Sequence, residues 1–132
     1  MEKQILIPSK IENLRKIEKF IDEISNECSL NSEVYGNVLI ATLEAVNNAI
    51  VHGNKLNEKF EVKINASFKN SILFISIEDK GKGFDYKHIP DPTAPENIEN
   101  ISGRGIFLME KLSDKLVFKK NGSIVEIYFN IK

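Results

Sequence analysis

The sequence predicts an α+β fold, a two-layer sandwich in which a mixed, mostly antiparallel sheet is covered on one face by about three helices. Apolar and polar residues alternate from Phe60 to Phe68, and a second strand over residues 72–78 follows a short turn. Two stretches of helical periodicity precede these strands, and strands and helices do not alternate strictly. A chain of 132 residues has the size of one domain with one core, so residues 1–132 are expected to form a single domain.

The N-terminal segment predicts an edge strand and a helix. Residues 3–7 alternate and then meet Pro8, which is typical of an edge strand because proline cannot donate a hydrogen bond to a sheet. Ser9 and Glu12 have the spacing of a capping box, which predicts that the first helix begins here and continues to Cys28.

The second helix is predicted to begin at Asn31 or Ser32, both good capping residues, and to end near Gly53 in a left-handed conformation. Within it, Glu44 and Asn48 are four residues apart and therefore lie one above the other beside the apolar face. The apolar positions of this helix are Leu39, Leu43, Val46 and Ile50.

The C-terminal part predicts a lid, a helix and a hairpin. Residues from about 85 to 102 contain three of the four prolines and show no periodicity, and a connection of that length in a small domain is usually functional. A helix is expected to follow Gly105. Two strands, at about 115–120 and 123–131, are predicted to pair through the Asn121–Gly122 turn.

Composition argues against several classes of function. The formal net charge is −1 and no basic stripe is present, which argues against direct nucleic-acid binding. Cys28 is the only cysteine, so neither an intramolecular disulfide nor a cysteine metal cluster is expected. No signal peptide and no apolar run near membrane length is evident, which predicts a cytoplasmic protein without a membrane partner.

Glu44 and Asn48 offer a carboxylate and a carboxamide to the same point, and no lysine or arginine lies within one turn of Glu44. Oxygen ligands at this spacing can share a hard cation such as Mg²⁺. The alternative is a surface glutamate beside a solvated asparagine.

Two glycine-containing segments could form the rest of a site. In Asp79-x-Gly81-x-Gly83, the glycines would let the backbone turn sharply beneath a flat ligand, and Asp79 could accept a hydrogen bond from the exocyclic amine of adenine. The Gly103-Arg104-Gly105 segment runs into a helix, where free amides, the helix dipole and the guanidinium of Arg104 favour phosphate. An ordinary turn and a lid hinge with an exposed arginine are the respective alternatives.

Taken together, residues 44–53, 79–84 and 103–109 resemble, in order and spacing, the N, G1 and G2 boxes of the ATP-binding fold shared by gyrase, mismatch-repair ATPases and histidine kinases. Within that superfamily the chain is most similar to the anti-sigma-factor serine/threonine kinases. There is no room for a dimerisation helix pair with a phospho-accepting histidine, or for a second domain that supplies a lysine.

The resemblance implies ATP and Mg²⁺ as cofactors, with Glu44 as catalytic base, Asn48 as Mg²⁺ ligand and Asp79 as adenine contact. It implies phosphorylation of a serine or threonine on an anti-anti-sigma (antagonist) protein, sequestration of a sigma factor or similar regulator, and a homodimer. The lid segment 90–96 lacks the lysine that some relatives carry there, which favours the alternative of a nucleotide-gated binding module without kinase activity. The implied pocket glycines are Gly81 and Gly83 at the base and Gly103 and Gly105 at the phosphates.

Overall fold

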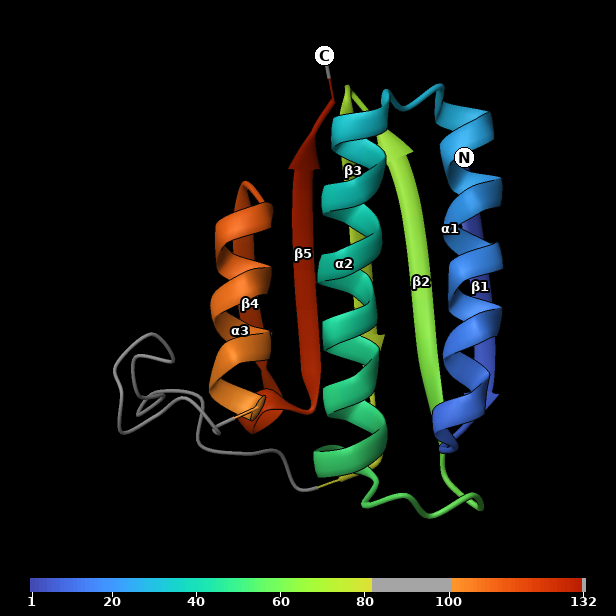
Figure 1. Ribbon diagram of the computed structural model, residues 1–132, viewed down its shortest axis with the longest axis vertical. Coiled ribbons are helices and arrows are strands. Elements are labelled where there is room, and N and C mark those ends of the chain that lie inside the picture. The colour runs from blue at the N-terminus through green and yellow to red at the C-terminus, as the bar shows by residue number, and fades with distance from the viewer. Residues whose placement is uncertain (82–100, 132) are drawn as a thin grey trace.

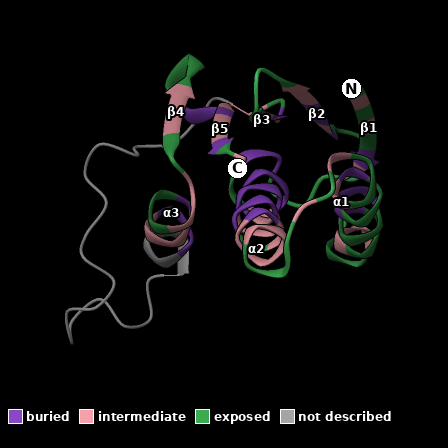
Figure 2. Ribbon diagram, turned by 90° about the horizontal axis from the view of Figure 1, so that it is seen from above, coloured by how far each residue is buried: buried purple, intermediate pink, exposed green. Residues whose placement is uncertain are grey.

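The computed structural model describes residues 1–81 and 101–131, and these form two layers (Figure 1). A five-stranded sheet with the order β1-β2-β3-β5-β4 makes one layer, and three helices on one of its faces make the other (Figure 2). The predicted α+β sandwich is confirmed. The elements are β1 (Glu2–Pro8), α1 (Leu14–Cys28), α2 (Ser32–Asn48), β2 (Glu61–Lys69), β3 (Ile72–Glu78), α3 (Ile101–Leu112), β4 (Lys115–Lys119) and β5 (Ile124–Asn130).

The four strand pairings of the described sheet are all antiparallel, which makes the sheet simpler than the mixed one expected. β1 lies at one edge, as its proline predicts, and pairs Pro8 with Glu61 of β2. Alternate residues of the central strands, such as Ile75 and Ile77, face the helices and are buried. The core therefore lies between the sheet and the three helices.

Two turns follow from their residues. Asn70 and Ser71, between β2 and β3, both have positive φ, at 56° and 62°, as a two-residue hairpin of type I′ requires. Residues 120–123 connect β4 to β5, and within them Lys120, Asn121 and Gly122 have φ of 49°, 58° and 95°. Both predicted hairpins are confirmed.

The predicted capping box is wrong. α1 begins at Leu14, after a short 3₁₀ turn, and the side chain of Ser9 caps neither helix. Instead, the Ser9 hydroxyl is buried and donates a hydrogen bond to the carbonyl of Phe60, at 2.6 Å. Ser9 therefore ties the end of β1 to the approach of β2, where its buried hydroxyl finds the partner that it needs.

α2 is the central helix of its layer (Figures 1 and 2). Asn31 caps it as predicted, with its Oδ1 accepting from the Val34 amide at 2.8 Å. With a π-helical turn, Ala49–Gly53, it runs continuously over 22 residues and is long and apolar enough, by length and composition, to cross a membrane. The buried core helix of a folded domain meets the same criterion, so this length does not by itself indicate a membrane span. Burial of one face explains the apolar sequence, with Val38, Ala41, Thr42, Ala45, Val46, Ala49 and Ile50 buried and Leu39 and Leu43 half-buried.

The predicted start of the third helix is also wrong. α3 begins at Ile101 and so contains the backbone of the Gly103–Gly105 segment, which was expected to precede it. The predicted lid, about 85–102, lies outside the described residues up to residue 100, and its last two residues belong to α3.

Candidate functional site

Asn48 stands at the last position of α2, and its side chain is buried. It is 6% exposed, and neither its Oδ1 nor its Nδ2 has a hydrogen-bond partner in the part of the chain that the structure describes. Buried polar groups in folded proteins are nearly always hydrogen-bonded, so a carboxamide without a partner among the described residues is a candidate ligand-binding group. Glu44, one turn earlier, is half-buried on the same side of the helix.

Gly105 brings α3 against this pair. A Cβ atom placed on Gly105 would lie 3.0 Å from Oε2 of Glu44 and 3.3 Å from Nδ2 of Asn48. Residue 105 therefore leaves the ends of the Glu44 and Asn48 side chains in place because it has no side chain of its own. α3 begins at the same end of the molecule at which α2 ends (Figure 1). The predicted N-box and G2-box residues thus meet in space.

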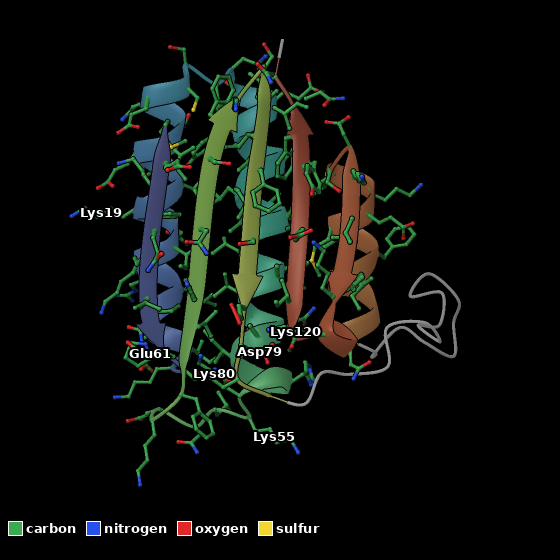
Figure 3. All side chains as sticks on the ribbon, turned by 180° about the vertical axis from the view of Figure 1, so that it is seen from behind. Lys19, Lys55, Glu61, Asp79, Lys80 and Lys120 are labelled. Carbon is green, nitrogen blue, oxygen red and sulfur yellow. The ribbon has the colours of Figure 1, made fainter. Side chains whose placement is uncertain are left out.

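Asp79 follows β3 directly and is 7% exposed. Its backbone amide donates to the Ser123 carbonyl at 2.9 Å, and its Oδ1 accepts from the amide of Gly81 at 2.8 Å. Burial raises the pKa of the Asp79 carboxyl above its ordinary value, the hydrogen bond from Gly81 opposes that change, and the charge of Glu78 adds to it. Figure 3 shows Asp79 at the lower end of the sheet, beside the end of α2.

Gly53 explains how the end of α2 and the Asp79 turn fit together. A Cβ atom on Gly53 would lie 2.3 Å from Oδ2 of Asp79, and one on Gly81 would lie 2.2 Å from the Gly53 carbonyl oxygen. Gly53 continues a π-helical turn and does not have a positive φ, so the predicted left-handed C-terminal glycine is wrong. Because Gly53 has no side chain, the carboxylate of Asp79 fits against it. This reason for a glycine is a tertiary contact, which the local sequence at a helix end does not reveal.

The structure therefore brings together Glu44, Asn48 and Gly105, and, at the same helix end, Asp79 and Gly81. The structure describes less of the other predicted site residues, Gly83, Gly103 and Arg104. Gly83 lies outside the described residues, Gly103 and Arg104 belong to the first turn of α3, and the side chain of Arg104 is not among those described.

Sequence reasoning missed Asn54, which is buried beside this turn. Its Oδ1 accepts a hydrogen bond from the amide of Lys80 at 2.7 Å, and its Nδ2 donates to Ser9 Oγ at 2.9 Å. These partners are 26 and 45 residues away along the chain. No local pattern signals such contacts.

The donor set fits a nucleotide with its magnesium better than a resident metal. Within residues 1–81 and 101–131, no group of three or more histidine, cysteine, aspartate or glutamate side chains could hold a metal ion. A cation bound at Asn48 would therefore take most of its ligands from phosphate oxygens and water, as Mg²⁺ usually does in nucleotide sites.

A family model described as the histidine kinase-like ATPase domain matches residues 7–129. The chain belongs to this family. The match includes Glu44, Asn48, Asp79 and Gly105, so the family that the three sequence motifs predict is confirmed.

Several relatives carry the name serine-protein kinase RsbW, and two of them show the extent of the similarity. The protein from Oceanobacillus iheyensis is 28% identical over 117 residues, which cover 84% of this chain and 74% of the relative. The protein from Staphylococcus aureus is 29% identical over 138 residues, which cover 98% and 86%.

Two solved structures share the fold. The RsbU and RsbW domains of a Mycobacterium tuberculosis protein match with a TM-score of 0.69 at 15% identity, over 100% of this chain and 32% of that one. This chain thus spans about a third of that solved two-domain chain. The histidine kinase domain of a blue-light activated kinase from Erythrobacter litoralis matches with a TM-score of 0.55 at 22% identity, over 95% of this chain and 62% of that one.

Proposed function

We propose that the protein is a cytoplasmic, ATP-dependent serine/threonine protein kinase of the anti-sigma-factor type. The observation that carries this proposal is the carboxamide of Asn48, which is buried beside Glu44 and against Gly105 and has no hydrogen-bond partner within residues 1–81 and 105–131. Buried polar side chains without a partner are uncommon in folded proteins, and this one lies one turn from a carboxylate at a helix end. The names of the RsbW relatives support the same activity.

Asn48 would hold Mg²⁺ through its Oδ1, and the bound ion would neutralise phosphate charge during transfer. Asn48 can do this because the end of α2 fixes the carboxamide, which has no competing protein partner among the described residues. The neighbouring Gly105 leaves the approach open, since a side chain at that position would contact the carboxamide.

Glu44 would act as the base toward the hydroxyl of the protein substrate. In phosphoryl transfer the enzyme mainly positions the reactants and stabilises charge, and a carboxylate that orients or deprotonates the attacking hydroxyl adds to the rate. The hydroxyl oxygen of the serine or threonine would bond to the γ-phosphorus while the bond between that phosphorus and the oxygen of the leaving ADP breaks. The proton of the hydroxyl would pass to Glu44.

Asp79 would recognise the base of ATP. Its carboxylate is held by the amide of Gly81 on one side and backed by Gly53 on the other, so it points in a fixed direction at the end of β3. A buried carboxylate needs donors, and the exocyclic amine of adenine can supply one.

The substrate would be an anti-anti-sigma (antagonist) protein, and the kinase would also sequester a sigma factor or similar regulator, acting as a homodimer. A nucleotide-gated module that binds such a regulator without phosphorylating it is the second candidate. The specific observation in its favour is the lid segment 90–96, which contains no lysine.

Incubation with γ-labelled ATP and an extract of the cell that produces the protein tests the proposal. A kinase transfers label to a protein of the extract, whereas Glu44→Ala binds ATP normally and transfers 10²–10⁴-fold less, roughly the effect of removing a general base. Label transfer by Glu44→Ala at the wild-type rate would exclude Glu44 as the base. ATP binding by the wild type without any transfer would favour the binding module.

A further inference from the structure

Asn54 is a buried polar side chain that the proposed chemical step does not use. It follows the π-helical turn directly and is 3% exposed. Its Oδ1 accepts from the Lys80 amide at 2.7 Å, while its Nδ2 donates to Ser9 Oγ at 2.9 Å and to the Glu61 carbonyl at 3.3 Å. One carboxamide therefore joins the end of β1, the start of β2 and the turn after β3.

The contact with Lys80 bears directly on Asp79. The Lys80 amide belongs to the peptide plane that also contains the Asp79 carbonyl, so its hydrogen bond to Asn54 fixes the orientation of that plane. Beyond this plane, the Gly81 amide bonds to Oδ1 of Asp79. Asp79, Lys80 and Glu61 lie at the same end of the sheet (Figure 3). The direction of the Asp79 carboxylate thus depends on the peptide that Asn54 holds.

We infer that Asn54 is a positioning residue that sets the preference of the site for adenine over guanine. The inference rests on the proposed function, in which Asp79 contacts the base. Adenine carries an amine donor where guanine carries a carbonyl acceptor, so a carboxylate held in one direction accepts from the first and is repelled by the second. A site built around a fixed hydrogen bond discriminates strongly because the wrong ligand leaves a buried group unpaired.

The chemistry of the position requires asparagine. A carboxamide offers both an acceptor for Lys80 and donors for Ser9 and Glu61. Aspartate could accept from Lys80 but could not donate to the Glu61 carbonyl. Alanine would leave the Lys80 amide without its partner and free the turn to rotate.

Titration of Asn54→Ala with MgATP and with MgGTP tests this inference, with Asn57→Ala as a matched control. Asn57 is exposed in the same loop, and its Oδ1 accepts only from the Lys59 amide at 3.0 Å among the bonds described. We expect Asn54→Ala to bind ATP about tenfold more weakly and to lose most of its preference over GTP, while kcat at saturating ATP changes less than about twofold. Asn57→Ala should behave as the wild type does.

Ser9→Ala separates positioning from mere stability. This variant removes one partner of Asn54 but leaves the bond to Lys80, so it should unfold at a lower temperature and keep its preference for ATP. Wild-type ATP preference in Asn54→Ala, or an equal loss in Ser9→Ala, would overturn the inference and leave the proposed function intact. Failure of the wild type to bind MgATP would overturn both.

A second measurement needs no variant and covers the case in which Asn54→Ala does not fold. Hydrogen exchange on the wild type should show the Lys80 amide as strongly protected as the amides of β3, and more so with MgATP. Exchange of the Lys80 amide at the rate of an exposed loop, with or without MgATP, would contradict the inference.

Discussion

Gly53 lies against the side chain of Asp79 so closely that a Cβ atom on the glycine would stand 2.3 Å from Oδ2. This contact joins the end of the helix that carries Glu44 and Asn48 to the turn that carries the proposed base contact. The two halves of the site are therefore not independent, and several consequences can be measured.

Gly53→Ala should weaken both folding and ATP binding. The added methyl group has to displace the Asp79 carboxylate, which the Gly81 amide also holds. We expect a loss of about 1–3 kcal/mol in the free energy of unfolding, the usual cost of overpacking. Urea denaturation and titration with MgATP measure the two effects.

Gly36→Ala is the matched control, since it adds a methyl group to the same helix where nothing lies within 4 Å. It should stabilise the protein by up to about 1 kcal/mol through helix propensity and leave ATP binding unchanged. Equal stability and equal affinity in Gly53→Ala and the wild type would show that the contact is not required.

Gly105→Ala should separate stability from activity. The new methyl group would meet the flexible end of Glu44 at 3.0 Å, which can move aside at little cost, and alanine favours a helix over glycine by about 1 kcal/mol. We expect unchanged or higher stability and at least about tenfold slower phosphoryl transfer, because Glu44 no longer points at the substrate hydroxyl. A variant that transfers phosphate at the wild-type rate would argue against this arrangement.

Asn48→Leu should stabilise the protein and abolish the dependence of ATP binding on Mg²⁺. The substitution replaces a buried carboxamide, which has no partner in the part of the chain that the structure describes, by an apolar group of similar shape. It therefore removes a penalty of about 1–3 kcal/mol. Thermal unfolding without nucleotide gives the first effect, and ATP titrations with magnesium and with EDTA give the second. Lower stability in this variant would mean that Asn48 has a protein partner.

Asp79→Asn should be more stable than the wild type at pH 7. Burial raises the pKa of Asp79 in the folded state above its ordinary value of 3.8. The folded protein is therefore stabilised by protonation of Asp79 below pH 3.8, and this stability is lost as the pH rises through the folded pKa. Asparagine avoids this loss, and its side-chain oxygen can still accept the hydrogen bond from the Gly81 amide. Its side-chain NH₂ group, however, is a donor and can repel the amine of adenine, which is also a donor.

The measurement for Asp79→Asn is unfolding from pH 3 to 8 beside ATP titration at pH 7. The stability gap to the wild type should close on acidification, and affinity for ATP should fall about tenfold or more. A stability difference between Asp79→Asn and the wild type that grows on acidification would contradict a raised pKa of Asp79.

Much of this site follows from local sequence. Glu44 and Asn48 meet because four residues return a helix to the same face, and Asp79 is placed because it ends a strand whose bounds, Ile72–Glu78, the alternation predicts correctly. These relationships depend on a few neighbouring residues. Local patterns suffice for them.

The predictions that were wrong concern residues whose conformation depends on tertiary contacts. Ser9 matches a helix cap in sequence but bonds to Phe60 and Asn54, and Gly53 matches a left-handed helix end but makes room for Asp79. The Gly103–Gly105 segment has low helix propensity, yet it lies inside α3 where Gly105 packs against α2. In each case the partner comes from a distant part of the chain and outweighs the local preference.

The central claim is that α2, the turn after β3 and the start of α3 bind one ATP molecule together. The most direct test follows backbone amide resonances by NMR while MgATP is added to the wild-type protein. We predict that the amide resonances of Asn48, Gly81 and Gly105 shift as MgATP is added and that all three give one common Kd. Shifts confined to a single segment, or none at saturating MgATP, would contradict it.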